Sequence, residues 1–265
     1  MKSGNHWETA GGVVQGATHI RQNKICQDAL YIHENTEGYA LVCVADGHGS
    51  DRCPFSDEGA KVAVKIAANI LVELMNSPDV KNTLAAHKDI RLPRQMEKAW
   101  KEAVQYLYTK REGAESIPAF SYELYGTTML ALVAAPDFIF ALQIGDGDLV
   151  AIQPDGTARW LLPQADNPGN ETESLCMEES WKYIRTQLIP VDNAENAPTM
   201  FLLSTDGYAN SFTTSEGFLK AGADIYRLWN DEGADFIQKN LEAWLAQTSA
   251  DGSGDDIAVA LVFSK

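Results

Sequence analysis

The chain has 265 residues, of which 45% are hydrophobic and 9% aromatic, and its formal net charge is −16. This composition excludes disordered and collagen-like proteins, and a chain of this length buries a sizeable core without disulfide bonds. The acidic excess argues against binding to nucleic acid or to an anionic membrane, since both attract basic surfaces. Two readings of the excess stay open: a solvated acidic surface, or acids that converge on bound cations.

The sequence shows neither a secretion signal nor the cysteine spacing of a structural zinc site. The N-terminal residues contain no apolar signal core, and no apolar run approaches the ~20 residues of a membrane span. The chain has four cysteines, and no two of them form a Cys-x-x-Cys pair. A structural zinc site is therefore disfavoured, and we expect a cytoplasmic protein with free thiols.

The N-terminal part of the chain predicts strands over residues 11–18, 29–33 and 39–45. The third is the strongest, because a short apolar run with β-branched residues is typical of a buried strand. Two helices are predicted next. The first is expected to be capped by Ser56, and the second to begin near Pro93, which suits a first helical turn. The predicted buried face of the first helix is an apolar stripe at Val62, Ile66, Ile70 and Leu74, with Ala63, Ala67 and Leu71 beside it.

The rest of the chain predicts mainly strands. They cover residues 128–134, 138–144, 199–203 and 257–263, with two short extended pieces inside 149–162 and one helix over 234–247. Strands and helices do not alternate one by one, which disfavours a doubly wound parallel sheet. Short turns between strands favour antiparallel pairing. We predict an α+β fold of two antiparallel sheets covered by helices, in a single domain over residues 1–265.

Acidic residues stand where the apolar runs begin or end. One such residue is usually a turn former, because Asp-Gly is a common turn pair. Several carboxylates at one end of two packed sheets would repel each other unless cations held them. Oxygen ligands without paired His or Cys favour Mg²⁺ or Mn²⁺ over zinc. The acidic pieces are Asp28, Asp46-Gly47-His48-Gly49, Gly145-Asp146-Gly147-Asp148, Thr205-Asp206-Gly207 and Gly254-Asp255-Asp256.

In this order the pieces resemble the metal-dependent serine/threonine protein phosphatases of the PP2C (PPM) family. Gly126-Thr127-Thr128 adds a further match, and the matching pieces span nearly the whole chain. The segment Gly16-Ala17-Thr18-His19 is more similar to the divergent bacterial branch than to the animal or plant enzymes. The resemblance implies a four-layer αββα sandwich with two central antiparallel β-sheets flanked by helices, and two metal ions, Mn²⁺ or Mg²⁺, at one end.

The resemblance also implies roles for individual residues. His48 matches the family's candidate general acid, which would protonate the leaving alkoxide. The implied metal site has Asp46 bridging both ions, the carbonyl of Gly47 on one ion, Asp206 and Asp255 on the other, Asp28 holding metal-bound waters, and Asp146 in a third, weaker site. The implied reaction is hydrolysis of phosphoserine and phosphothreonine in proteins by a metal-bridging water.

Two segments depart from the family pattern. Many members place a phosphate-gripping Arg five residues before the acid equivalent to Asp28, and this chain has Asn23 there. We expect Arg21 or Lys24 to reach the substrate phosphate instead. The flap region 162–198 lacks the family's Gly-Gly and Arg-x-x-Gly motifs. Asp256 stands where Asn is common, and could add a carboxylate or make a loop hydrogen bond.

Two other classes of function stay open beside the phosphatase. The missing Arg fits a pseudophosphatase, which would bind a phosphoprotein without turnover, although the complete set of metal ligands argues against it. A structural cation-binding protein would leave His48 without a role. For the enzyme, we expect a phosphorylated protein substrate, a partner Ser/Thr kinase, no nucleic acid or membrane partner, and a monomer.

Overall fold

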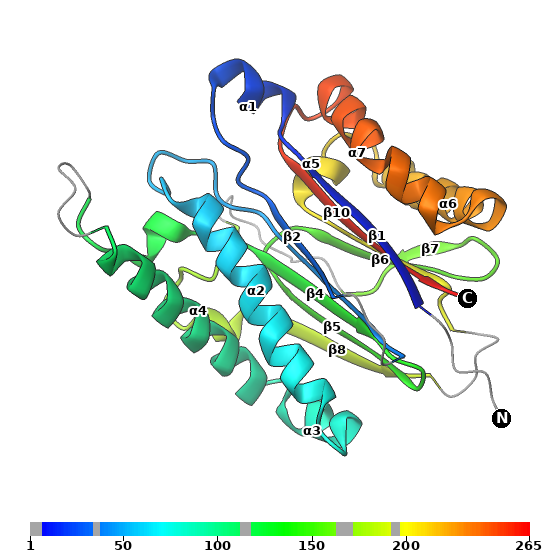
Figure 1. The fold of residues 1–265 in the computed structure, drawn as a ribbon, viewed down its shortest axis with the longest axis horizontal. Helices are drawn as coiled ribbons and strands as arrows, with labels where there is room; N and C mark the ends of the chain where they lie inside the picture. Colours follow the sequence, from blue (N-terminus) through cyan, green and yellow to red (C-terminus); the bar gives the residue numbers. More distant parts are fainter. Residues whose placement is uncertain (1–6, 34–37, 112–117, 163–171, 192–196) are drawn as a thin grey trace.

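Two antiparallel sheets of five strands each lie at the centre of the computed structural model (Figure 1). The structure describes residues 7–33, 38–111, 118–162, 172–191 and 197–265. Sheet A has the order β1 (Trp7–Val14), β10 (Ile257–Ser264), β9 (Met200–Ser204), β6 (Asp148–Ile152) and β7 (Ala158–Trp160). Sheet B has the order β2 (Ala29–His33), β3 (Ala40–Ala45), β4 (Met129–Ala134), β5 (Phe138–Ile144) and β8 (Arg185–Pro190).

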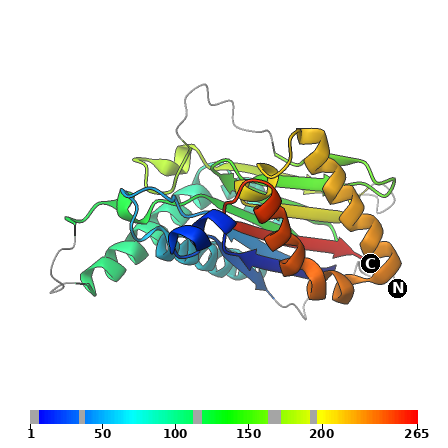
Figure 2. The same cartoon turned by 90° about the horizontal axis from the view of Figure 1, so that it is seen from above.

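Helices cover the outer face of each sheet and complete four layers. Figures 1 and 2 show two groups of helices on opposite sides of the paired sheets. Sheet B carries α2 (Ser56–Met75), α3 (Val80–His87) and α4 (Arg91–Thr109), and sheet A carries α6 (Ser215–Glu232) and α7 (Ala234–Asp251). The shorter elements are α1 (Ala17–Gln22), η1 (Tyr122–Tyr125), η2 (Ser180–Lys182) and α5 (Asp206–Ala209). The αββα prediction is confirmed.

The central strands are apolar along their whole length because both of their faces are buried. On β3, Leu41 and Cys43 face the helices of sheet B, while Val42 and Val44 face the other sheet. The side chains of β10 divide in the same way between the helices of sheet A and the space between the sheets. Successive side chains of a strand point to opposite faces, so such a strand has no polar side. This explains why the apolar runs predicted these strands well.

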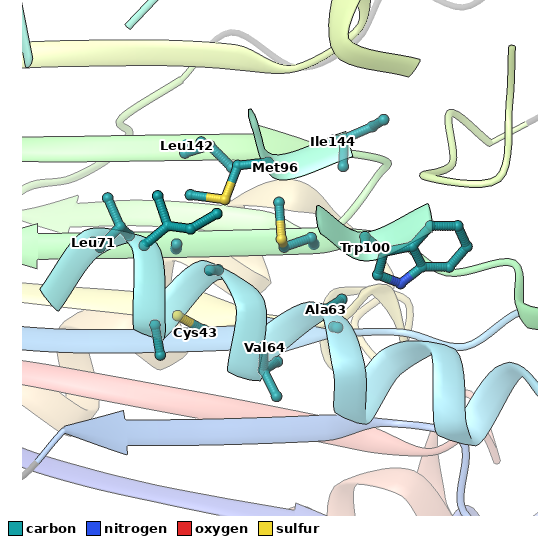
Figure 3. Close-up of a cluster of buried hydrophobic side chains, with 14 of the residues drawn as sticks. Cys43, Ala63, Val64, Leu71, Met96, Trp100, Leu142 and Ile144 are labelled. Atoms are coloured by element: carbon teal, nitrogen blue, oxygen red, sulfur yellow. The ribbon is translucent and has the colours of Figure 1, made fainter. Parts of the chain in front are cut away.

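The helix layer over sheet B is closely packed. Figure 3 shows α2 and α4 side chains meeting the β5 side chains Leu142 and Ile144. Trp100 is fully buried, and its indole Nε1 donates a hydrogen bond to the carbonyl of Gly59 at 3.0 Å. A Cβ on Gly59 would stand 1.9 Å from the carbonyl oxygen of Tyr125. The α2 backbone can approach this segment only because residue 59 has no side chain.

The prediction for α2 was wrong in two details. Ile70, Leu71, Ala63 and Ala67 are buried as predicted, but Val62, Ile66 and Leu74 are only partly buried, and Ala60 and Ala68 belong to the buried face instead. Small side chains let the helix lie close to the sheet, so the bulkier Val62, Ile66 and Leu74 lie at the edge of the contact between helix and sheet. Ser56 makes no cap hydrogen bond, and its hydroxyl instead accepts one from Gln27 Nε2 at 2.8 Å.

Several element boundaries also differ from prediction. The first strand spans Trp7–Val14 rather than residues 11–18, because its pairing with β10 ends where Val14 meets Ile257. The second predicted helix begins at Arg91, so Pro93 is its third residue. The last helix continues to Asp251. No helix within the described ranges is long and apolar enough to cross a membrane.

Candidate active site

The sheets bring the predicted acids to one end of the sandwich. Ala29 of β2 pairs with Ala45 of β3, so Asp28 and Asp46 stand next to each other at that edge. On the facing sheet, Asp206 follows the end of β9, and the Asp255 loop leads into β10, which pairs with β9. Antiparallel neighbours therefore place chain segments from far apart in the sequence at one edge.

These segments line a cleft of about 750 Å³. Five of the six predicted metal residues, Asp46, Gly47, Asp146, Asp206 and Asp255, line it together with His48. Asp28 is 5% exposed and does not reach the cleft surface. The described cleft residues are His19, Gln27, Asp46, Gly47, His48, Gly49, Ser50, Arg52, Cys53, Glu123, Asp146, Thr172, Ser174, Cys176, Met177, Asp206, Asp255 and Asp256.

The backbone around Asp46 is fixed by the loop before β4. Asp46 N–H donates to Thr128 Oγ1 at 3.0 Å, and its carbonyl accepts from Thr128 N–H at 2.8 Å and from Thr127 Oγ1 at 2.7 Å. Next in the chain, Gly47 N–H donates to the carbonyl of Gln27 at 3.1 Å. The match to Gly126-Thr127-Thr128 thus marks residues that hold the Asp46 loop rather than residues that reach the cleft.

The buried Asp28 carboxyl is hydrogen-bonded to Thr205. The Thr205 hydroxyl donates to Asp28 Oδ2 at 2.6 Å and accepts from the N–H of Ala258 at 2.9 Å. Burial raises the pKa of Asp28, the hydrogen bond from Thr205 opposes this, and the negative charge of Asp256 adds to the rise. The hydroxyl joins the ends of β2, β9 and β10 beneath the cleft.

Asp46 and Asp206 are partly buried carboxyl groups that lie close enough to interact through their side chains. Burial raises the pKa of Asp46, and the charges of Asp28 and Asp206 raise it further. Burial likewise raises the pKa of Asp206, with the charge of Asp146 as the next cause. Carboxylates that crowd together in this way destabilise each other unless a positive charge compensates them.

His48 lines the same cleft as these carboxylates. Its backbone N–H donates to the carbonyl of Gly126 at 3.0 Å, which fixes the start of its loop. Burial lowers the pKa of the imidazole, and the charge of Asp146 acts in the other direction. Asp146 itself is exposed and accepts a hydrogen bond from Thr172 Oγ1 at 2.7 Å. The cleft therefore contains several carboxylates and a titratable imidazole that can donate a proton.

Asp256 makes loop hydrogen bonds, which is one of the two roles that the sequence left open for it. Its carboxylate, 3% exposed, accepts from the N–H of Gly16 at 2.6 Å and from the N–H of Gln27 at 2.7 Å. His19 Nδ1 lies 2.9 Å from the same carboxylate, and His19 Nε2 lies 3.6 Å from Asp255 Oδ1. Asp256 thus fastens the segment before Asp28 to the loop that carries Asp255.

Sequence reasoning missed His19, Gln27 and Thr205 as parts of this site. The signals that could have singled them out are the matched piece Thr205-Asp206-Gly207 and the nearness of His19 and Gln27 to Asp28 in sequence. Neither Arg21 nor Lys24 is among the residues that line the cleft. Arg21 Nη2 instead donates to Thr18 Oγ1 at 2.8 Å, within the exposed α1 segment.

The donor set suits a hard divalent cation. The groups that converge are carboxylates and one backbone carbonyl. Among the described residues, the neighbours that shift the pKa of Asp46 and Asp206 are other carboxylates. Such oxygen ligands suit Mg²⁺ or Mn²⁺. Across the described residues, no three His, Cys, Asp or Glu side chains already stand in an arrangement that ligates one ion. Binding would therefore require rotation of these side chains, which the partly exposed Asp206 and the exposed Asp255 allow.

Comparison with known proteins agrees with this geometry. The chain is 25% identical over 186 residues to serine/threonine-protein phosphatase 3 of Escherichia coli K12, a match that covers 68% of this chain and 67% of that protein. It superimposes on Stp1 of Staphylococcus aureus with a TM-score of 0.65 at 14% identity, covering 100% of this chain and 98% of that one. PppA of Pseudomonas aeruginosa gives a TM-score of 0.61 at 18% identity, covering 98% of each chain.

The family assignment comes from the match to a family model. Residues 15–246 match the model described as protein phosphatase 2C. This range contains Asp28, Asp46, Asp146 and Asp206, whereas β1, the end of α7, the Asp255 loop and β10 lie outside it. The chain therefore belongs to the protein phosphatase 2C family, whose members are metal-dependent protein phosphatases.

Proposed function

We propose that this chain hydrolyses phosphoserine and phosphothreonine in proteins at the cleft built around Asp46 and Asp206. The observation that carries the proposal is the convergence of Asp46, Asp206 and Asp255 on one cleft wall that also contains His48. Family membership and this complete carboxylate set favour the enzyme over a phosphoprotein-binding module. The same set leaves a purely structural cation site without a use for His48.

The residues have separate tasks in this proposal. Asp46, Asp206, Asp255 and the carbonyl of Gly47 would hold two divalent ions, Mn²⁺ or Mg²⁺, with Asp28 acting through waters and Asp146 serving a third, weaker site. When bound, such ions lower the pKa of a bridging water and neutralise phosphoryl oxygens.

The remaining groups of the chain orient and protonate. His48 would pass a ring proton to the leaving oxygen of the serine or threonine. A neutral imidazole still carries one N–H, so the lowered pKa of His48 does not remove its ability to donate. The hydrogen bonds of Thr205 and Asp256 fix the positions of the loops that carry Asp28 and Asp255.

The proposed partners follow from the reaction. A protein phosphatase needs phosphoproteins as substrates and a Ser/Thr kinase that produces them. We propose a single-domain monomer in the cytoplasm, where a reducing environment keeps the four free cysteines as thiols. Size-exclusion chromatography with light scattering tests the oligomeric state, and a dimer would contradict it.

The decisive experiment is phosphate release from a phosphothreonine peptide with and without Mn²⁺. We expect Mn²⁺-dependent turnover by the wild type and a loss of at least about 100-fold in Asp46→Asn and Asp206→Asn, since each removes a charge that holds the ions. Asp224→Asn on the exposed face of α6 is the matched control and should keep full activity.

Two results would contradict the proposal. Full activity in both cleft variants would place the reaction elsewhere. Tight phosphopeptide binding without turnover in saturating Mn²⁺ would instead favour the pseudophosphatase.

A further inference from the structure

The charged residues on the cleft wall are mostly acidic. Six of the described lining residues are Asp or Glu, and Arg52 is the only Lys or Arg among them. A phosphate monoester is a dianion at neutral pH and is repelled by such a wall wherever the acids are not neutralised. Arg52 is therefore the one permanently positive side chain that the described part of this chain offers at the cleft.

Arg52 stands on a short turn with a fixed base. The turn is closed by the N–H of Cys53, which donates to the carbonyl of Ser50 at 2.9 Å. Its ends are fastened to the segment before β4, because His48 N–H donates to Gly126 at 3.0 Å and Phe55 N–H donates to Leu124 at 2.9 Å. The backbone of Arg52 is thus placed four residues beyond His48, while its side chain is 84% exposed and free to move.

The ion pair that Arg52 makes in the structure is weak. Its Nη1 lies 4.0 Å from Glu123 Oε1, and the Glu123 side chain is itself 54% exposed. Exposed ion pairs of this kind contribute about 0–1 kcal/mol, so little is lost when the pair separates. A phosphoryl group offers the guanidinium two oxygens at once, in a geometry that matches its planar fork.

Other cations around the cleft are engaged in the structure. Arg185 Nη2 donates to the carbonyl of Gly145 at 2.6 Å and lies 3.8 Å from Glu173 Oε2. Lys101 Nζ donates to Glu97 Oε1 at 2.5 Å and to the carbonyl of Met177 at 2.9 Å. Neither side chain lines the cleft. Both would have to give up these contacts to meet a substrate, whereas Arg52 would give up only Glu123.

We propose that Arg52 binds the phosphoryl oxygens of the substrate, and that it leaves its weak pair with Glu123 to do so. This inference rests on the proposed phosphatase function. It gives the phosphate-binding role to the turn after Asp46-Gly47-His48, and not to Arg21 or Lys24.

The test compares Arg52→Ala, Arg52→Lys and Arg227→Ala with the wild type, using a phosphothreonine peptide in saturating Mn²⁺. Arg227 lies on the exposed face of α6 and is the matched control. Loss of a charge-assisted hydrogen bond predicts a KM about 10–100-fold higher in Arg52→Ala, with a smaller fall in kcat. Arg52→Lys should recover part of this loss, and Glu123→Gln should leave KM unchanged or lower it.

A binding measurement separates this inference from the proposed function. Calorimetry with inorganic phosphate in Mn²⁺ needs no turnover, and Arg52→Ala should bind phosphate at least about 10-fold more weakly than the wild type. A wild type without turnover would refute the phosphatase function, while weaker phosphate binding by Arg52→Ala would still support Arg52. The inference is overturned if Arg52→Ala stays within twofold of the wild type in both KM and phosphate affinity.

Discussion

Thr205 connects the core to the proposed metal site through a single hydroxyl. Its side chain is fully buried, donates to Asp28 Oδ2 at 2.6 Å and accepts from Ala258 N–H at 2.9 Å. Thr205→Val keeps nearly the same volume but replaces this hydroxyl with a methyl group. The buried Asp28 carboxyl then loses its donor, and the buried Ala258 N–H loses its side-chain acceptor.

The size of the effect follows from these two groups. Leaving a buried polar group without its partner costs about 1–3 kcal/mol, so the loss of both partners should lower the free energy of unfolding by about 2–6 kcal/mol. Thr205→Ser is the matched control, because it keeps the hydroxyl and loses only a methyl group, which costs about 1 kcal/mol. The difference between Val and Ser isolates the hydrogen bonds.

Urea denaturation of the metal-free proteins at neutral pH measures both values. At about 2–4 °C per kcal/mol for a chain near this size, the Val variant should also unfold at a clearly lower temperature than the Ser variant. If Thr205→Val were as stable as Thr205→Ser, the hydroxyl would not be what holds Asp28. The account of how the core positions this carboxylate would then be wrong.

Two further substitutions test the packing. Gly59→Ala should lower the free energy of unfolding by about 3 kcal/mol or more in chemical denaturation, because its Cβ would stand 1.9 Å from a backbone oxygen. Gly222→Ala is the control: its Cβ would have its nearest neighbour at 3.8 Å, so the stability should be unchanged or rise by up to ~1 kcal/mol. Equal stability of the two variants would refute the reasoning. Burial raises the pKa of Tyr208 to about 12. The unfolded chain therefore releases this proton first, and stability should fall between about pH 10 and 12 less steeply in Tyr208→Phe than in the wild type, as urea midpoints across that range would show. Parallel curves would contradict this reading of Tyr208.

The strands buried on both faces were the easiest part of the fold to predict. The run at 138–144 coincides with β5, and the run at 39–45 matches β3 apart from its first residue. The edge strand β8 was missed because each of its residues is at least partly exposed, so Arg185–Pro190 contains no apolar run. The 18-residue helix α6 was also missed, since glycines at 217 and 222 interrupt its apolar pattern.

The site was predictable as far as it consists of acids at strand ends. Asp46, Asp206 and Asp255 follow or precede strong apolar runs, and they reach the cleft. His19 and Asp256 were not predicted as partners, because their contact joins α1 to a loop 237 positions further along the chain and nothing in either local sequence specifies it. Arg52 gave no signal for the same reason: only the folded cleft shows that it is the lone Arg or Lys among the described wall residues.

The most direct test of the central claim is a crystal structure with Mn²⁺, read from the anomalous scattering of the metal. We expect two manganese peaks about 3.5–4 Å apart, with Asp46 bound to both ions and Asp206 and Asp255 bound to one of them. Asp28 should contact them only through water. Manganese that avoids Asp46 and Asp206, or binds only at the exposed Asp146, would contradict the account.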